Sequence, residues 1–536
     1  MAQYQPKSSL KLLTVSILAS CTLTGCFGDS NDNINNTPPA SEQTVSSISG
    51  TVVDQISLNP IAGAIVTVDG QDYTTDNNGE FILSNLPANT TVMLTINANG
   101  YPERTFNTTT SNGPALEVEY QLNNDSTVTS VTQSISADFS LRIEELGAQV
   151  DIPADALVRA DGQPIVGDVT VTMDVITPSI DSEEMPGGYD IVDGGFMESF
   201  GAVNITAVDA DGNPLVMADD NLASLVIPVS TRNIDAIAAQ MPLFFYDQAL
   251  GGWVQTGTAT LQTLDDDTQV YAAEVDEVGA WNVDIEMSTV NVFGCVEDTA
   301  GNRISNAVVK GDGINYSSIT TTMTDSNGDF ALPVRDNGNL YVYAENGYRT
   351  SNAKSISTLG SDYQMNDGCL VVSTDNDSLS IRLTWGELPL DVDSYLRTPS
   401  GDVVFYNNQA SLTQAPFAAL DVDDRYSFGP EFVTVRKLMV GRYSYGVDNY
   451  SETQNPGLKD SPISVRLEGP TIRSRTITPT LNDATLNSNS WHAFDLVVDE
   501  NCRITYESVD VWLSDSEFDS VFNSNMPVTP RYCTAP

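Results

Sequence analysis

Short alternating segments fill most of this chain and limit what it can fold into. Stretches such as AIVTVDG, VTVTMDVI and NLYVYAE alternate apolar and polar residues, and Gly, Asn, Asp and Pro separate them about every ten residues. Alternation with a period of two gives a strand one buried and one solvated face. The segment IDAIAAQM allows a helix of about two turns at most. The pattern predicts an all-β chain of tandem β-sandwich domains.

Length and charge restrict the possible partners. A chain of 536 residues is too long for one hydrophobic core and predicts several domains. Its 72 acidic residues outnumber 23 basic ones, which gives a formal net charge of -49. Because such a surface repels phosphate backbones, we expect no nucleic-acid partner. Hydrophobic residues make up 40% of the chain, enough to form cores, so it is expected to be globular.

The N-terminus predicts export. Lys7 and Lys11 precede the apolar run LLTVSILAS, which reads as a signal peptide. The run leads to LTGC, residues 23–26, which resembles the lipobox of bacterial lipoproteins. The resemblance implies cleavage before Cys26 and acylation of that cysteine, hence a stable membrane anchor. Phe27 stands where an aspartate would resemble an inner-membrane retention signal. We therefore expect a bacterial outer-membrane lipoprotein, periplasmic or surface-exposed; the alternative is an ordinary secretory signal.

The remaining cysteines agree with an oxidising compartment. Cys295, Cys369, Cys502 and Cys533 allow three pairings, and proximity in sequence favours Cys295–Cys369 and Cys502–Cys533. A metal site built on these cysteines is less expected, because the chain has no CxxC pair and a single histidine.

An acidic stretch centred on glycine occurs twice, as TTDNNGEF at 74–81 and as MTDSNGDF at 323–330. An EF-hand loop needs a glutamate at its twelfth position, and its glycine comes later than here. Asp-x-x-Gly between two strands instead predicts a turn, in which the Asp side chain accepts hydrogen bonds from backbone N–H groups and Gly takes a positive φ. We interpret both stretches as turns.

The surroundings of these turns match as well. Gly50, Val52, Asp54, Ala64 and Val66 correspond to Gly294, Val296, Asp298, Ala307 and Val309, and Gly100-Tyr101 corresponds to Gly347-Tyr348. The pattern resembles the carboxypeptidase-regulatory, transthyretin-like β-sandwich. Pro60 and Gly63-Ala64 complete it in the first copy, whereas the second copy departs from it there. The resemblance implies structural or binding modules without catalytic residues.

A different block separates the two copies. GAQVDIPADAL, ESFGAVNITAVDADGNPL and VGAWNVD are its most distinctive parts. Over about residues 130–287 it resembles the extracellular β-domain of cartilage intermediate-layer and astroprincin-type proteins, which implies an interaction module. Its large aromatic residues are interpreted as core rather than ligand-stacking side chains: Phe244, Phe245, Trp253 and Trp281.

The last block contains the best candidate for site chemistry. Its motifs W-x-x-x-P-x-D-x-D-S-x-L and L-D-x-D-x-x-x-x-G-P-E resemble an uncharacterised β-sandwich domain of bacterial secreted proteins. Carboxylates two residues apart on a strand share a face, and several such oxygens suit Ca2+, the one cofactor expected. The alternative is a solvated rim or a set of turn caps. The candidate metal ligands are Asp391, Asp393, Asp421, Asp423, Asp424 and Glu431.

Catalytic motifs are not found. The sole histidine, His492, alternates with Phe494 and Leu496 and is interpreted as a packed core residue. The sequence contains no G-x-S-x-G elbow, HExxH motif or phosphate loop. Paired-carboxylate glycosidase chemistry stays open, since 72 acids make any pairing uninformative. We expect a protein that is not an enzyme.

Together these features predict a non-catalytic, lipid-anchored envelope protein that binds or bridges a protein or glycan partner. The alternative is an accessory subunit that binds carbohydrate or peptide beside a separate enzyme. An exposed row formed by Tyr443, Tyr445 and Tyr450 would favour glycan binding. The expected organisation is a signal peptide with lipobox (1–26), a flexible tether (27–46), a first carboxypeptidase-regulatory-like sandwich (47–125), the cartilage-intermediate-layer-like domain (126–288), a second regulatory-like sandwich (289–373) and a C-terminal β-sandwich (374–536).

Overall fold

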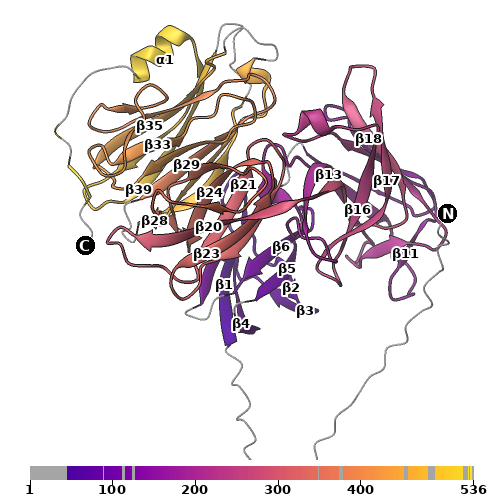
Figure 1. Cartoon of the computed structure of the whole chain (residues 1–536). Coiled ribbons are helices and arrows are strands. Elements are labelled where there is room, and N and C mark those ends of the chain that lie inside the picture. Colours follow the sequence, from indigo (N-terminus) through magenta and orange to yellow (C-terminus); the bar gives the residue numbers. More distant parts are fainter. Residues whose placement is uncertain are drawn as a thin grey trace, which may run out of the picture. The chain divides into compact units, whose positions relative to one another are not determined.

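The computed structural model describes residues 45–88, 90–110, 115–123, 127–347, 349–373, 378–451, 457–480, 489–522, 529 and 531–533. Cys26, the signal peptide and nearly all of the expected tether lie outside these residues, and so does Tyr348 of the second repeat. Within them β-strands dominate, which confirms the all-β prediction (Figure 1). No helix in the described part of the chain is long and apolar enough to cross a membrane.

Helical structure is sparse in the described ranges. Three single-turn 3-10 helices occur, η1 (Ser182–Glu184), η2 (Ile234–Ala236) and η3 (Leu458–Asp460). The segment IDAIAAQM thus forms one turn rather than two. The α-helix α1 (Asp515–Phe522) was not predicted. It buries Phe518 and Phe522 against Tyr395, which explains its amphipathic pattern.

The first repeat folds into two facing sheets around one core. The core includes Val52, Val66, Phe81 and Leu94, all buried. Strand β1 pairs antiparallel with β4 and parallel with β7. The first sheet has the order β4-β1-β7 (Glu80–Pro87, Val45–Asp54, Leu116–Leu122), and the second has the order β3-β2-β5-β6 (Gln71–Thr74, Ile65–Val68, Thr91–Asn97, Arg104–Thr109).

The second repeat has the same strand order, so the repeat seen in the sequence is also a structural repeat. Its first sheet is β23-β20-β27 (Asp329–Arg335, Thr289–Asp298, Tyr363–Gln364), and β28 (Leu370–Val372) also pairs in parallel with β20. Its second sheet is β22-β21-β24-β25 (Ile319–Met323, Val308–Gly313, Asn339–Asn346, Arg349–Thr350), with β26 (Lys354–Ser357) on β24.

The Asp-x-x-Gly segments are turns, as predicted. The Asp76 carboxylate accepts hydrogen bonds from the backbone N–H groups of Asn78 and Glu80 at 2.8 and 3.0 Å. Asp325 does the same for Asn327 and Asp329, at 2.8 and 3.0 Å. The glycine of each turn has a positive φ, +72° in the first copy and +75° in the second. With their oxygens occupied by N–H donors, these aspartates serve the turns and not a metal.

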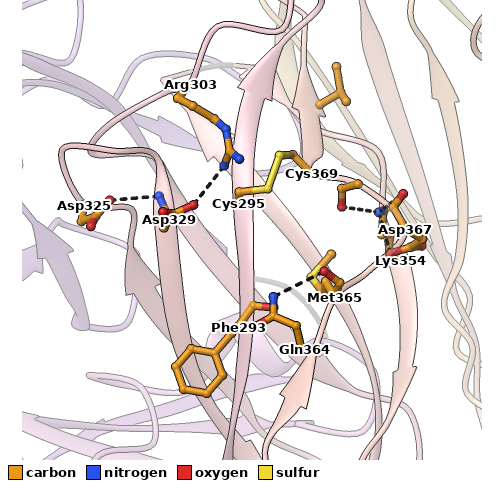
Figure 2. The surroundings of a disulfide bond; sticks show 12 residues. Phe293, Cys295, Arg303, Asp325, Asp329, Lys354, Gln364, Met365, Asp367 and Cys369 are labelled. Carbon is orange, nitrogen blue, oxygen red and sulfur yellow. Dashed lines mark hydrogen bonds and ion pairs between the residues drawn. A yellow bond between two sulfur atoms is a disulfide. The ribbon is translucent and has the colours of Figure 1, made fainter.

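Both predicted disulfides are present, Cys295–Cys369 and Cys502–Cys533. The first joins β20 to the residue just before β28, its parallel neighbour. Figure 2 shows it beside the Arg303–Asp329 ion pair, with Lys354 and Asp367 on its other side. Each crosslink therefore closes a loop within its own part of the chain, as proximity in sequence predicted.

The block between the repeats forms one antiparallel sheet of ten strands rather than two facing sheets. Trp253, Phe244 and Trp281 are buried and Phe245 is half-buried, which confirms the core interpretation. A small pair, β11 (Leu157–Arg159) and β14 (Leu215–Met217), accompanies the sheet. The order is β8-β12-β13-β19-β16-β17-β18-β15-β10-β9 (Val128–Gln133, Val169–Ile176, Phe196–Val208, Ala280–Met287, Gln240–Asp247, Gly252–Thr263, Gln269–Val275, Ala223–Pro228, Ala148–Ile152, Phe139–Ile143).

The C-terminal block is again a two-sheet sandwich. Its core contains the buried Trp385, Trp491, Tyr443 and Tyr445. One sheet has the order β32-β33-β34-β29-β36-β37 (Ala410–Ser411, Ala418–Val422, Glu431–Val435, Leu379–Thr384, Ser464–Gly469, Ile472–Ile477). The other has the order β31-β30-β35-β38-β39 (Val403–Val404, Asp393–Arg397, Gly441–Asp448, Ser490–Val498, Ile504–Leu513).

Candidate metal centre

Two loops and two strand ends of the C-terminal sandwich bring acidic side chains together. Asp393 begins β30 in one sheet, and Glu431 begins β34 in the other. Asp391 precedes β30, and Asp423 follows β33. We call these four residues, Asp391, Asp393, Asp423 and Glu431, the acidic cluster. The two sheets that form the core thus both contribute to it.

The W-x-x-x-P and G-P-E motifs explain how these loops are held. The indole N–H of Trp385 donates to the carbonyl of Pro389 at 2.9 Å, which fixes the loop that carries Asp391. The backbone N–H of Trp385 donates to the carbonyl of Phe428 at 3.1 Å. Gly429 has a φ of +72° and packs under the Trp385 ring, where a Cβ atom would lie 2.5 Å from a ring carbon. Only glycine fits there, and the turn it makes leads directly into Glu431.

The cluster has the dimensions of a cation site. Carboxylate oxygens of Asp393, Asp423 and Glu431 all lie within 4.8 Å of one another. Two oxygens on opposite sides of a bound Ca2+ are about 5 Å apart, so this spacing fits. Glu431 is 0% exposed, Asp393 is 2% exposed, and the Asp423 side chain is 9% exposed. Ligands that are all carboxylates suit a hard cation rather than zinc.

Each of the four acids has a buried oxygen without a hydrogen-bond donor among the described residues: Asp391 Oδ1, Asp393 Oδ2, Asp423 Oδ1 and Glu431 Oε1. The other oxygen has a partner in two cases. Glu431 Oε2 accepts from the backbone N–H of Ser394, and Asp423 Oδ2 lies 2.9 Å from the guanidinium of Arg425. Buried carboxylate oxygens without donors are costly, and a bound cation would remove that cost.

Burial and mutual repulsion raise the pKa values of three acids in the cluster. Burial, followed by repulsion from Asp391 and Asp423, raises the pKa of Asp393 to about 8. Burial and the charge of Asp393 raise the pKa of Glu431 well above its usual range. Burial, then Asp423, raises the pKa of Asp391 as well. Acids that resist ionisation in this way are expected where a cation normally balances the charge.

Two of the six predicted ligands do not join the cluster. Asp421 Oδ2 accepts hydrogen bonds from the hydroxyl of Thr434 at 2.6 Å and from the N–H of Ala353 at 3.2 Å. The carboxylate of Asp424 accepts from the hydroxyl of Tyr341 at 3.2 Å. The expectation that Asp421 and Asp423 share a face was wrong, because the register of β33 on β34 shifts between Leu420 and Val422 and Asp423 lies beyond the strand.

Other sequence expectations have mixed outcomes. His492 is largely buried and packs against the Phe522 ring, but it also contacts Asp495 at 2.9 Å, a partner that the sequence did not indicate. The row of exposed tyrosines that would have favoured glycan binding is not formed by Tyr443, Tyr445 and Tyr450. Tyr443 and Tyr445 are core residues, and only Tyr450 is exposed. Arg425 and Ser394 were missed as neighbours of the cluster, although Ser394 directly follows Asp393 and Arg425 lies two residues after Asp423 in sequence.

A second group of charges differs from the acidic cluster because its acids are paired. Glu183 lies 3.1 Å from both Lys310 and Arg466 and accepts a hydrogen bond from the Tyr343 hydroxyl at 2.9 Å. Although burial alone would raise it, these cations hold the pKa of Glu183 well below its usual range. Glu183, Lys310 and Arg466 line a cavity of about 400 Å³ that the acidic cluster does not line. Paired acids leave no oxygens for a metal.

Comparison with known families supports the first of the predicted modules. Residues 47–123 match the family described as carboxypeptidase regulatory-like domain. This match confirms the resemblance inferred from Gly50, Gly63-Ala64 and the turn at Asp76. It covers the first sandwich and not the acidic cluster. No curated protein sequence matches the chain.

Parts of some solved structures match the chain at low sequence identity. They include the Bacillus anthracis TIE protein (11% identity, 61% of this chain and 51% of that chain, TM-score 0.14). BcpA, the major pilin subunit of Bacillus cereus, shares 12% identity over 61% of this chain and 99% of its own, with a TM-score of 0.13. The major pilin SpaD of Corynebacterium diphtheriae shares 8% identity over 61% and 97%, with a TM-score of 0.12. The chain spans about half the length of the Bacillus anthracis protein. At these TM-scores no functional argument is drawn from them.

Proposed function

We propose that the chain is a non-catalytic, lipid-anchored protein of the bacterial outer membrane that binds or bridges a partner, and that its C-terminal sandwich does so with Ca2+ held by Asp391, Asp393, Asp423 and Glu431. One observation carries the calcium part of the proposal. Carboxylate oxygens of Asp393, Asp423 and Glu431 lie within 4.8 Å of one another, and each of the four acids has a buried oxygen without a donor among the described residues. A divalent cation is the partner that such oxygens fit best.

The binding role is supported by the modules. Residues 47–123 match a carboxypeptidase regulatory-like domain, and resemblance to that family implies a structural or binding role. The proposed division keeps the sequence-based boundaries, 47–125, 126–288, 289–373 and 374–536. An accessory role beside a separate enzyme stays the alternative, and it shares the calcium site.

The test is a thermal-unfolding scan of the chain from residue 27 onward, in calcium and in chelator. A ligand that binds only the folded state stabilises it by about 2.7 kcal/mol at a hundredfold excess over Kd. We expect one transition to rise in calcium, and the rise to be lost in Asp393→Asn and in Glu431→Gln.

Asp421→Asn is the matched control, since it neutralises a neighbouring acid whose oxygen has other partners. Equal melting in calcium and chelator would refute the site. A calcium shift that persists equally in all three variants would indicate general charge screening instead.

A further inference from the structure

Large apolar side chains are exposed around the acidic cluster more than elsewhere in the C-terminal sandwich. Among the described residues after 377, four such side chains are exposed: Leu390 at 42%, Tyr426 at 82%, Tyr450 at 55% and Val511 at 42%. Three of the four lie on loops that carry or contact the cluster. Exposed aromatic residues gathered at one place indicate a contact surface rather than chance.

Hydrogen bonds connect the loops that carry these three residues to the cluster. Leu390 directly precedes Asp391, and its carbonyl accepts from the N–H of Ser427, next to Tyr426, at 2.7 Å. The backbone N–H of Asp391 donates to the hydroxyl of Ser451, next to Tyr450, at 3.0 Å. The loops that hold the acids therefore also hold the apolar rim, formed by Leu390, Tyr426 and Tyr450.

A third aromatic residue adjoins the rim. The rings of Tyr406 and Tyr450 meet edge to face with centroids 5.3 Å apart. Tyr406 therefore extends the aromatic surface beside Tyr450.

The coordination requirement of calcium leaves room for such a ligand. Ca2+ takes about six to eight oxygens. The cluster offers four oxygens without donors. Carboxylates bind Ca2+ through one or both oxygens, and the positions that they leave open are filled by water or by ligand oxygens. Four carboxylates outweigh the charge of one divalent ion and Arg425, and the whole chain carries -49, so an anionic ligand is disfavoured. Neutral hydroxyl oxygens fit these positions.

We propose that this rim and the bound Ca2+ together form a carbohydrate-binding site, in which neighbouring sugar hydroxyls coordinate the ion and the apolar face of the sugar ring packs on Tyr426 and Tyr450. The inference rests on the proposed calcium site. Tyrosine rings provide flat apolar faces with a polar edge, which suits a sugar ring with one C–H face and several hydroxyls. Neutral polysaccharides with vicinal hydroxyl pairs are the ligand class.

The test measures retention of the full chain on immobilised mannan and galactan, in calcium and in EDTA. We expect retention on at least one polymer in calcium only. The double variant Tyr426→Ala/Tyr450→Ala should bind at least about tenfold more weakly, because it removes both stacking faces. Its calcium-induced thermal shift should stay as in the parent, which also shows that it folds. Val511→Ala removes another exposed apolar side chain, three strands away from β30, and this control variant should bind as the parent does.

The outcomes separate the two proposals. A calcium shift without retention on any polymer overturns the carbohydrate site and leaves the calcium site standing. Retention that persists in EDTA, or that is unchanged in the tyrosine double variant, also overturns it. Absence of the calcium shift in the parent refutes both.

Discussion

Gly50 and Phe81 lie directly opposite each other on the antiparallel strands β1 and β4, and the phenyl ring covers the glycine. A Cβ atom on Gly50 would lie 2.2 Å from the tip of the ring. The second repeat has the same pair, Gly294 opposite Phe330, with a corresponding distance of 2.5 Å. The first glycine and the final phenylalanine of the repeated pattern are therefore one packing unit.

This contact makes Gly50→Ala destabilising. Overpacking a filled site typically costs about 1–3 kcal/mol, because the ring must leave its rotamer or the strands must separate. We expect a lower melting temperature for one transition in calorimetry. Gly257→Ala is the control, since a Cβ atom there meets nothing within 4 Å and its φ is not positive. Equal effects of the two substitutions would show that backbone entropy and not packing dominates.

The Cys295–Cys369 disulfide is expected to stabilise the second repeat. It spans 74 residues of sequence, and a crosslink over a loop of that length contributes about 2–4 kcal/mol through the unfolded state. The double variant Cys295→Ser/Cys369→Ser should unfold at lower denaturant than the parent under non-reducing conditions. Under reducing conditions the difference should shrink. A difference that persists unchanged would assign the effect to the serine side chains.

The buried carboxyl group of Asp284 is expected to make the folding stability depend on pH. Asp284 is fully buried on β19, opposite Ser199. Burial is the main cause that raises the pKa of Asp284 well above its usual range, and the charge of Glu198 adds to it. Glu198 itself is paired with Arg335. In the unfolded chain an aspartate side chain ionises at about pH 4. Above that pH the unfolded chain has lost a proton that the folded chain keeps, so stability falls as pH rises, by up to about 1.4 kcal/mol per pH unit.

Asp284→Asn removes this titration while keeping the size of the side chain. We expect the variant to melt at a higher temperature than the parent at pH 8 and at a similar temperature at pH 4. Melting curves recorded across this range provide the measurement. Parallel pH profiles for the two proteins would contradict a raised pKa at Asp284.

Thr434 should matter for stability but not for calcium. Its hydroxyl donates to Asp421, whose pKa burial raises to about 7. Thr434→Val keeps the shape and removes the donor, which should cost about 1–3 kcal/mol where Asp421 is ionised. Thr434→Ser keeps the hydroxyl and is the control. The calcium-induced shift should be the same in all three proteins, and a loss in the valine variant would place Asp421 in the metal site after all.

Replacing Cys26 tests the anchor. If acyl chains on Cys26 attach the protein to the membrane, the Cys26→Ser variant should appear in the soluble fraction after cell fractionation. A protein with one acyl chain or none binds membranes only weakly. A variant that stays with the membrane pellet after a salt wash would rule out the lipid as the sole attachment.

Local sequence rules predicted what depends on neighbouring residues. The Asp76 and Asp325 turns follow from an Asp-x-x-Gly spacing, because the acceptor and the N–H donors lie within four residues. The strands and the buried aromatic residues follow from alternation and size. The two disulfides follow from proximity, since each pair closes its own segment.

The tertiary structure alone decided which acids meet. Asp393 and Glu431 are 38 positions apart, on different sheets, and only the packing of those sheets brings their oxygens together. A register shift at Asp421 then directs that carboxylate to Ala353 and Thr434, and nothing in the spacing of L-D-x-D indicates the shift. The sequence by itself determined the all-β fold and the turns, because these depend on local geometry, and it favoured the cysteine pairing that the structure contains. The composition of the acidic cluster and of its apolar rim depended on long-range packing.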